Sequence, residues 1–250
     1  MRPPPRWLRR APLVRRPLRR LMKRVAPTGP VEATVDGLAW SLAPRDNKVD
    51  FDIWYKARLD EAEERRFLAA HLRAGDVFVD VGANIGLYTL ALLSAVEGVL
   101  AVTFEPLDAL RERQRINLAI NGLAHRARVR SEAVGPYGTM TLYEGRNAGR
   151  ASLVPFAGAR AVRHVTVRPL RSLLDRPPRA IKIDVEGFED QALLPYFDEL
   201  APAWWPRAVV IETLHRAAWR RNCLCELASR GYLIELQTDE NALLVRRDPY

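Results

Sequence analysis

An apolar segment leads straight into a glycine turn in the first half of the sequence, and few folds accommodate that order. Residues 77–81 (Val-Phe-Val-Asp-Val) precede a turn made of Gly82, Ala83, Asn84, Ile85 and Gly86, after which a helical pattern begins. Glycines at both ends of such a turn let the backbone pass close under a ligand at a helix N-terminus. We therefore predict that this turn binds a cofactor on a βαβ unit.

Strand and helix patterns alternate along the rest of the chain. Strands are predicted at residues 77–81, 99–104, 128–134, 180–184 and 208–212, and a terminal pair at 232–236 and 242–245. Helices are predicted at residues 87–96, 107–120, 189–199 and 216–230, and an excursion with strands near 139–143 and 163–167 separates the third and fourth main strands. This order predicts an α/β fold with right-handed crossovers and a mostly parallel sheet.

The positive charge of the chain is concentrated at its start. Ten of the 39 Lys and Arg residues lie in residues 1–30, which hold no acid, so the remainder carries 29 basic and 30 acidic side chains. Its prolines predict that helix in this tail is confined to residues 18–25. Two interpretations stay open: a disordered, solubilising arm, or a segment attracted to an anionic membrane.

Residues 31–58 predict a small hairpin around Asp36 and Gly37.

Two acids follow the first two strands of the βαβ unit. Glu105 closes the second strand 19 residues after Gly86, where an acid in nucleotide-binding units accepts both ribose hydroxyls. Asn84 occupies the place of the glycine that lets a pyrophosphate approach, so the turn suits a cofactor with a carboxylate and a sulfonium. Asp80 is suited to the ammonium of its methionine part. Alternatively, Glu105 caps the following helix and Asp80 is an ordinary acid at a strand end.

Charged residues interrupt the fourth strand, where both faces of a parallel sheet should be apolar. Lys182, Asp184 and Glu186 follow the period of a strand and should share one side, and Glu212 ends the fifth strand on the same rim. With His215 they form a pool of candidate catalytic residues from which a proton acceptor is drawn. A simple Lys182–Asp184 ion pair and a solvent-facing His215 are the alternatives. The three carboxylates could also hold a divalent metal ion, which we favour less.

These segments together resemble the FkbM-type methyltransferase family. The motifs are Asp80 to Gly86, Phe104-Glu105-Pro106, Ile181 to Glu189 and Val210-Ile211-Glu212. The resemblance implies that residues 59–250 form a Rossmann-like class I methyltransferase domain, with a seven-stranded sheet whose last strand is antiparallel. It also implies that Gly82 to Gly86 hold the methionine part of S-adenosylmethionine, that Glu105 holds the ribose, and that Glu132 or Ala133 contacts the adenine.

The predicted function is S-adenosylmethionine-dependent O-methylation of a sugar, glycolipid or natural-product hydroxyl. A nicotinamide-dependent oxidoreductase and a non-catalytic membrane adaptor are the alternatives. The expected partner is a small molecule or a glycan. A nucleic acid is not favoured, because the body of the chain is close to neutral and lacks the Asn-Pro-Pro-aromatic motif of base methylation. Two closely spaced cysteines and the lack of a convincing secretory signal predict a cytoplasmic protein, with peripheral membrane association through residues 1–30 left open.

Overall fold

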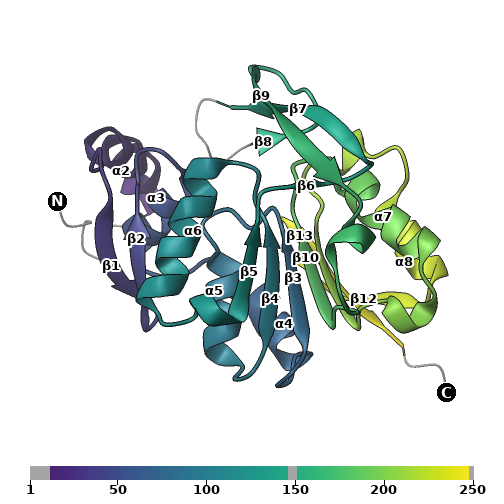
Figure 1. The fold of residues 1–250 in the computed structure, drawn as a ribbon. Coiled ribbons are helices and arrows are strands. Elements are labelled where there is room, and N and C mark those ends of the chain that lie inside the picture. Colours follow the sequence, from purple (N-terminus) through teal and green to yellow (C-terminus); the bar gives the residue numbers. More distant parts are fainter. Residues whose placement is uncertain (1–11, 146–150, 248–250) are drawn as a thin grey trace.

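The apolar segments of the sequence form a seven-stranded sheet at the centre of the computed structural model, which describes residues 12–145 and 151–247 (Figure 1). The strand order is β12-β13-β11-β10-β3-β4-β5. Their bounds are β3 Val77–Val81, β4 Leu100–Phe104, β5 Ala127–Arg130, β10 Ala180–Ile183, β11 Ala208–Glu212, β12 Tyr232–Gln237 and β13 Asn241–Arg246. Five strands are parallel, and β13 runs antiparallel between β11 and β12. The predicted α/β fold, with its antiparallel last strand, is confirmed.

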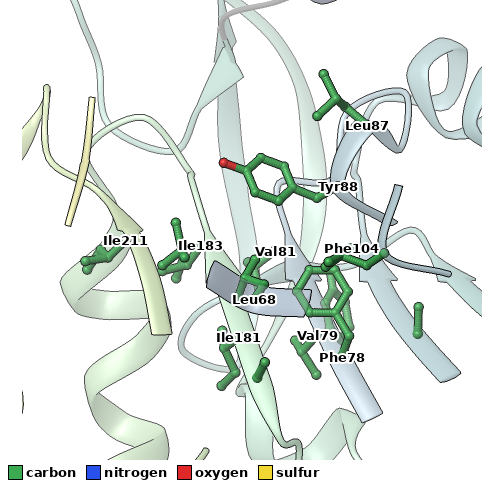
Figure 2. Packing of buried hydrophobic residues seen from close by; sticks show 14 of the residues in the cluster. Leu68, Phe78, Val79, Val81, Leu87, Tyr88, Phe104, Ile181, Ile183 and Ile211 are labelled. Carbon is green, nitrogen blue, oxygen red and sulfur yellow. The ribbon is translucent and has the colours of Figure 1, made fainter. Parts of the chain in front are cut away.

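The strands at the centre of the sheet are buried along their whole length. Every residue of β3, β10 and β11 is buried, as two covered faces require. The main helices are α4 Ala62–Ala70, α5 Leu87–Ala95, α6 Asp108–Ile120, α7 Glu189–Glu199 and α8 Cys223–Ser229. Side chains from α4 and α5, among them Leu68 and Leu87, join those of the strands in one apolar core (Figure 2).

Two segments differ from the prediction. The third strand ends at Arg130, and the chain then enters a second sheet of order β6-β9-β7-β8. Its strands are β6 Ala133–Val134, β7 Gly138–Glu144, β8 Ala151–Ser152 and β9 Arg160–Arg168. The helix predicted over residues 216–230 is divided into a short 3₁₀ turn, Arg216–Ala218, and α8, because the Asn222 side chain caps a new helix by accepting from two backbone amides.

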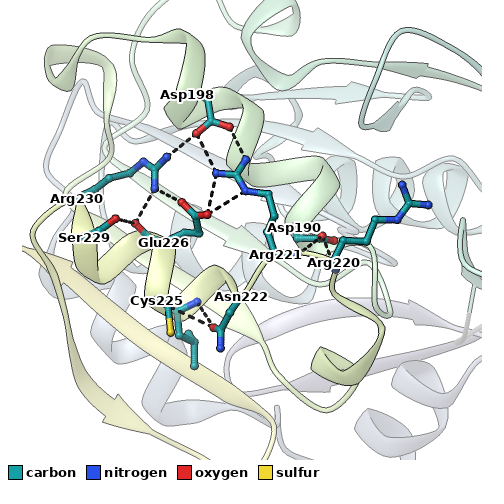
Figure 3. A network of polar contacts seen from close by, with 10 residues as sticks. Asp190, Asp198, Arg220, Arg221, Asn222, Cys225, Glu226, Ser229 and Arg230 are labelled. Carbon is teal, nitrogen blue, oxygen red and sulfur yellow. Dashed lines mark hydrogen bonds and ion pairs between the residues drawn. The ribbon is translucent and has the colours of Figure 1, made fainter.

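An ionic network fixes the segment after β11 against α7 (Figure 3). The Arg221 guanidinium donates to Asp198 of α7 over 2.6 Å and also pairs with Glu226 of α8. Arg230 bridges the same two carboxylates. Asp190 accepts the backbone amides of Arg220 and Arg221. The chain that leaves the end of β11 is therefore held at several points.

The hairpin predicted before the main domain is present and docks on α6. It consists of β1 Val31–Val35 and β2 Leu38–Leu42. Two asparagines, one in α6 and one at its C-terminal cap, bind backbone amides of β2. The side-chain oxygen of Asn117 accepts the amide of Ser41 over 2.7 Å, and that of Asn121 accepts the amide of Ala39 over 3.0 Å. The helix α3, Lys48–Lys56, follows the hairpin and was not predicted.

The first described element is a helix longer than the sequence predicted. The helix α2 spans Pro12–Val25 and includes Pro17, whereas helix was expected only over residues 18–25. Met22 and Ala26 are buried against the domain, and Arg19 pairs with Asp52 of α3 over 2.6 Å. The remainder of the predicted tail, residues 1–11, lies outside the described residues. Within the described parts of the chain, no helix is long and apolar enough to cross a bilayer.

Candidate functional site

A cavity of about 730 Å³ lies at the carboxyl ends of β3, β4, β10 and β11, the edge where open parallel sheets bind ligands. Ten of the twelve residues predicted for the site line it: Gly82, Ala83, Asn84, Glu105, Glu132, Ala133, Asp184, Glu186, Glu212 and His215. The other two, Asp80 and Gly86, do not line it. The topology thus brings together residues that are up to 133 positions apart in the sequence.

The glycine turn fits tightly between two strands. A Cβ on Gly82 would lie 1.9 Å from the backbone oxygen of Asp184, so only glycine allows β3 and β10 to meet here. Gly86 caps α5 with a φ of +87°, and a Cβ there would lie 2.8 Å from Cγ of Gln114. Asn84 adopts a left-handed φ of +53°. Non-glycine residues hold such a backbone only where their surroundings fix it, which is common at ligand sites.

Asp80 lies behind the turn instead of in the cavity. It is fully buried and accepts the Thr89 hydroxyl over 2.6 Å. Burial raises the pKa of its carboxyl, and the nearby Lys182 partly offsets the rise. Asp80 therefore supports the turn from beneath. The sequence suggested a direct contact between Asp80 and the methionine ammonium, but the Asp80 side chain is not exposed to the cavity.

Glu105 contacts both the start of the following helix and the cofactor turn. One carboxylate oxygen accepts the amide of Leu107 at the start of α6, and the other accepts the amide of Asn84 in the turn, each over 2.9 Å. Burial raises the pKa of its carboxyl to about 7. Glu105 thus supports the following helix, fixes the turn and still lines the cavity.

Lys182 and Asp184 form the ion pair that was considered as the alternative to a catalytic role. The ammonium lies 3.3 Å from Asp184 and 3.4 Å from the backbone oxygen of Gly82. Burial alone would lower the pKa of Lys182, but the charges of Asp184, Asp80 and Glu61 raise it. A charge buried this deeply is tolerated because it is paired and hydrogen-bonded.

Glu186 lies beyond the end of β10, so the strand period used in the prediction does not determine its position, although it lines the cavity with Lys182 and Asp184. The strand β10 ends at Ile183, and Glu186 takes a left-handed φ of +56°. Its carboxylate lies 3.3 Å from Nδ1 of His215, which is also 3.4 Å from Glu212. Burial and the charges of Asp184 and Glu189 raise the pKa of Glu212 to about 8. A neighbouring carboxylate stabilises the charged form of an imidazole and so favours it as a proton acceptor, and Glu186 lies in this position.

Among the described residues, Asp184, Glu189 and Glu212 are the acids placed to hold a metal ion, with one ligand atom from each within 4.8 Å of the others. Glu189 takes the place of Glu186 in the set predicted from the sequence. Both carboxylate oxygens of Glu189 already accept hydrogen bonds from the protein. Its two oxygens accept the amides of Val185 and Gly187 and the indole N–H of Trp219, the last over 2.6 Å. Recruiting Glu189 to a cation would release these donors.

Sequence reasoning missed three parts of the cavity wall. Lys48 of α3 and Glu61, which precedes α4, line it together with Tyr88 of α5, and the Tyr88 hydroxyl donates to Glu61. Ser152 of the second sheet is buried and donates over 2.9 Å to the backbone oxygen of Glu186. The available signal was Asn47, a helix cap directly before Lys48. Nothing local in the sequence placed Ser152 here.

A model of the methyltransferase FkbM domain matches residues 80–232. This range begins at the acid of β3 and includes the turn, Glu105 and the whole β10–β11 rim. The chain belongs to the FkbM methyltransferase family. It is therefore an S-adenosylmethionine-dependent methyltransferase, and membership in this family argues against the nicotinamide oxidoreductase considered above.

Solved structures similar to this FkbM methyltransferase are distant in sequence. An rRNA methylase from Streptococcus thermophilus is 11% identical, with a TM-score of 0.47, and the match covers 74% of this chain and 95% of that one. A precorrin-6Y C5,15-methyltransferase from Geobacter metallireducens is 13% identical, with a TM-score of 0.47 and coverage of 74% and 88%. An O-methyltransferase from Thermotoga maritima is 11% identical, with a TM-score of 0.46 and coverage of 76% and 66%. The comparison with curated proteins gives no match.

The cavity of the FkbM domain fits S-adenosylmethionine in size and in chemistry. Its volume of about 730 Å³ lies within the range of roughly 300–1,000 Å³ typical of small-molecule sites. Acids at Glu105 and along the β10–β11 rim suit a ligand that carries hydroxyls, an ammonium and a sulfonium. The turn at the start of α5 offers backbone groups close to the ligand.

Proposed function

We propose that this methyltransferase methylates a hydroxyl oxygen of a sugar, glycolipid or natural product. The arrangement of His215 between Glu186 and Glu212, next to Asp184 and inside the cavity, carries the proposal. Bound S-adenosylmethionine would supply an electrophilic methyl group. A hydroxyl is a poor nucleophile until its proton is taken up, so this reaction needs a basic group at the acceptor end.

Each residue has a part in this proposal. The turn from Gly82 to Asn84 and the acid Glu105 would hold the cofactor, with Glu132 and Ala133 at its adenine end. His215 would take the hydroxyl proton, the carboxylate of Glu186 would stabilise the imidazolium, and Glu212, whose pKa is raised to about 8, would help to orient the ring. Asp184, held by Lys182, would position the acceptor oxygen, because alignment supplies much of the rate in such a displacement.

The experiment combines product analysis with three substitutions. The protein is incubated with methyl-labelled S-adenosylmethionine and a cell extract, and the products are identified by mass spectrometry. His215→Gln should lower turnover on the order of 10²–10⁴-fold, the usual contribution of a positioned base. Asp184→Asn and Glu212→Gln should lower turnover less. All three should still bind S-adenosylhomocysteine, measured by calorimetry.

His125→Gln is the matched control, since that histidine is exposed and lies outside the cavity. Turnover of His215→Gln within about threefold of the parent would remove His215 as the base. Label on nitrogen or carbon would contradict O-methylation, and no label in any product would favour the adaptor. Loss of turnover on chelation, restored by Mg²⁺, would make Asp184, Glu189 and Glu212 metal ligands.

A further inference from the structure

Lys48, Val49 and Glu61 line the cavity, and they belong to a segment, residues 47–61, that lies outside the range matched by the family model. Both ends of this segment are tied to the cofactor turn and its helix. Asn47, the cap of α3, donates its side-chain amide to the side-chain oxygen of Asn84 over 2.6 Å. At the other end, Glu61 accepts the hydroxyl of Tyr88, one residue into α5. The segment thus faces the part of the turn that would hold the methionine end of the cofactor.

This side of the cavity carries a basic side chain, Lys48, whereas most ionisable residues of the cavity wall are acids. The cofactor's methionine part carries one carboxylate and one ammonium. Among the described lining residues, Lys48 and Lys182 are the two with permanently basic side chains. Lys182 is buried and held by Asp184 and the backbone oxygen of Gly82. A ligand carboxylate therefore needs Lys48 as its counter-ion.

Lys48 is well placed for this contact. Its side chain is 61% exposed, and its ammonium lies 3.4 Å from Asp52, on the same helix. Because it follows Asn47 directly, the contact between Asn47 and Asn84 anchors it beside the turn. A flexible ammonium at the mouth of a cavity can turn to an incoming anion, and Asp52 would keep Arg19 and Lys56 as partners if Lys48 did so.

Glu61 offers the complementary charge. It is half-buried and has a left-handed φ of +57°. Two other non-glycine residues of the described cavity wall, Asn84 and Glu186, also have a left-handed backbone. The ring of Tyr88 lies over the ends of β3 and β10, with its hydroxyl directed away from Leu87 (Figure 2). Tyr88 thereby holds the Glu61 carboxylate at the ends of these strands, where an ammonium of the ligand would lie.

We infer that Lys48 and Glu61 clamp the amino-acid end of the cofactor, Lys48 on its carboxylate and Glu61 on its ammonium. This inference rests on the binding of S-adenosylmethionine and is independent of the acceptor. It assigns part of the cofactor site to a segment that precedes the family domain in the sequence. The two groups recognise a zwitterion, so they would distinguish the intact cofactor from adenosine derivatives that lack its amino-acid end.

The test measures the affinity of the full-length protein for three ligands by calorimetry. S-adenosylhomocysteine carries both charges, its decarboxylated analogue carries only the ammonium, and 5′-methylthioadenosine carries neither. Lys48→Met should weaken S-adenosylhomocysteine roughly tenfold or more, the range of a charge-assisted hydrogen bond, and should leave the other two ligands unchanged. Glu61→Gln should weaken the first two and leave 5′-methylthioadenosine unchanged. Lys48→Arg should restore most of the affinity.

Lys56→Met is the matched control, because Lys56 flanks Asp52 on the opposite side, at 3.7 Å, and does not line the cavity. It should bind all three ligands as the parent does. If Lys48→Met weakens S-adenosylhomocysteine and 5′-methylthioadenosine equally, Lys48 acts through the fold and the clamp is wrong; an unchanged affinity for S-adenosylhomocysteine also overturns it. A parent that does not bind S-adenosylhomocysteine at all would instead refute the proposed function.

Discussion

Gly82 shows how a single residue defines the site. It adopts a φ of +77° at the point where β3 ends, and the backbone oxygen of Asp184 occupies the space that any side chain would need. The same contact brings Asp184 and its partner Lys182 to the floor of the cavity. The glycine is required twice, by its backbone conformation and by its neighbour.

This double requirement predicts that Gly82→Ala is more harmful than an alanine at another left-handed glycine. Gly122 has a φ of +69°, but a Cβ added there would meet nothing within 4 Å, so Gly122→Ala isolates the cost of the backbone conformation, which is about 1–2 kcal/mol. Gly82→Ala should lose clearly more stability and should also lose S-adenosylhomocysteine binding. Urea unfolding compares the two variants; equal midpoints would show that β10 moves aside without cost.

At the residue scale, strand ends predicted which residues line the cavity. Glu105 and Asp184 follow the ends of β4 and β10 and lie in the cavity wall, while their roles toward cofactor and acceptor stay predictions. The position of Glu186 did not follow from the strand period, because its left-handed backbone breaks that period one residue after Val185. Glu61 and Lys48 were missed because their position depends on how a preceding segment packs over the turn; Asn47 indicates where α3 begins but not where that helix packs.

At the scale of elements, helix bounds were predicted correctly where the residues that end the helix lie next to it in the sequence and were recognised. The helices α5, α6 and α7 were predicted to within a residue or so, since glycine turns and strand ends delimit them. The helix over residues 216–230 was overextended because the Asn222 cap was not recognised. Pro17 was taken as a barrier to α2, yet the helix continues through it and is held by the packing of Met22 and the Arg19–Asp52 pair.

The outer face of α2 predicts binding to anionic membranes. Leu21 and Val25 are 55% and 39% exposed, and the neighbouring Arg20, Lys23 and Arg24 are exposed as well. Each basic residue near an anionic surface contributes about 1 kcal/mol. We expect the protein to sediment with phosphatidylserine vesicles at low salt, and a variant with glutamine at these three basic positions to sediment much less.

The same variant provides the controls. Arg19 is unchanged in it, so α2 should stay docked and the melting temperature should be close to that of the parent. Added salt should release the parent from the vesicles, because screening weakens the attraction. Equal sedimentation with uncharged phosphatidylcholine vesicles would contradict an electrostatic role for this face.

At the scale of the whole molecule, the sequence predicted the central sheet better than what covers it. Alternating strands and helices restrict the connections of the sheet to few arrangements, and the position of β13 follows from the terminal hairpin. The second sheet and the N-terminal hairpin instead depend on distant contacts, such as Ser152 with Glu186 and Asn117 with Ser41. The second sheet contributes Ala133, Leu142 and Ser152 to the cavity wall, so the site depends on segments outside the central sheet.

Several acids with a raised pKa lie in or near the cavity, and three of them, Glu61, Glu105 and Glu212, line it. Burial raises the pKa of six carboxyl groups: Asp50, Glu61, Asp80, Glu105, Glu189 and Glu212. The raised pKa is about 6 for Asp50, about 7 for Glu105 and about 8 for Glu212. The acids with a lowered pKa, such as Asp198 and Glu226, change protonation below about pH 4.5. Between about pH 4.5 and 8, the buried acids therefore bind more protons in the folded state than in the unfolded state.

This difference predicts that the ligand-free protein becomes less stable as the pH rises from about 5 to 8, since stability falls with pH wherever the folded state binds more protons. Glu212 should contribute most, because its pKa is raised to about 8 by burial and by Asp184, Glu189 and Glu186. Glu212→Gln, which cannot ionise, should flatten the slope, whereas Glu63→Gln, at an exposed position, should leave it unchanged. Urea unfolding at several pH values measures this dependence. A parent whose stability rises over this range would mean that the carboxylates of the β10–β11 rim are ionised and held by a positive charge, and the acceptor end of the cavity would then favour a cation over a neutral hydroxyl.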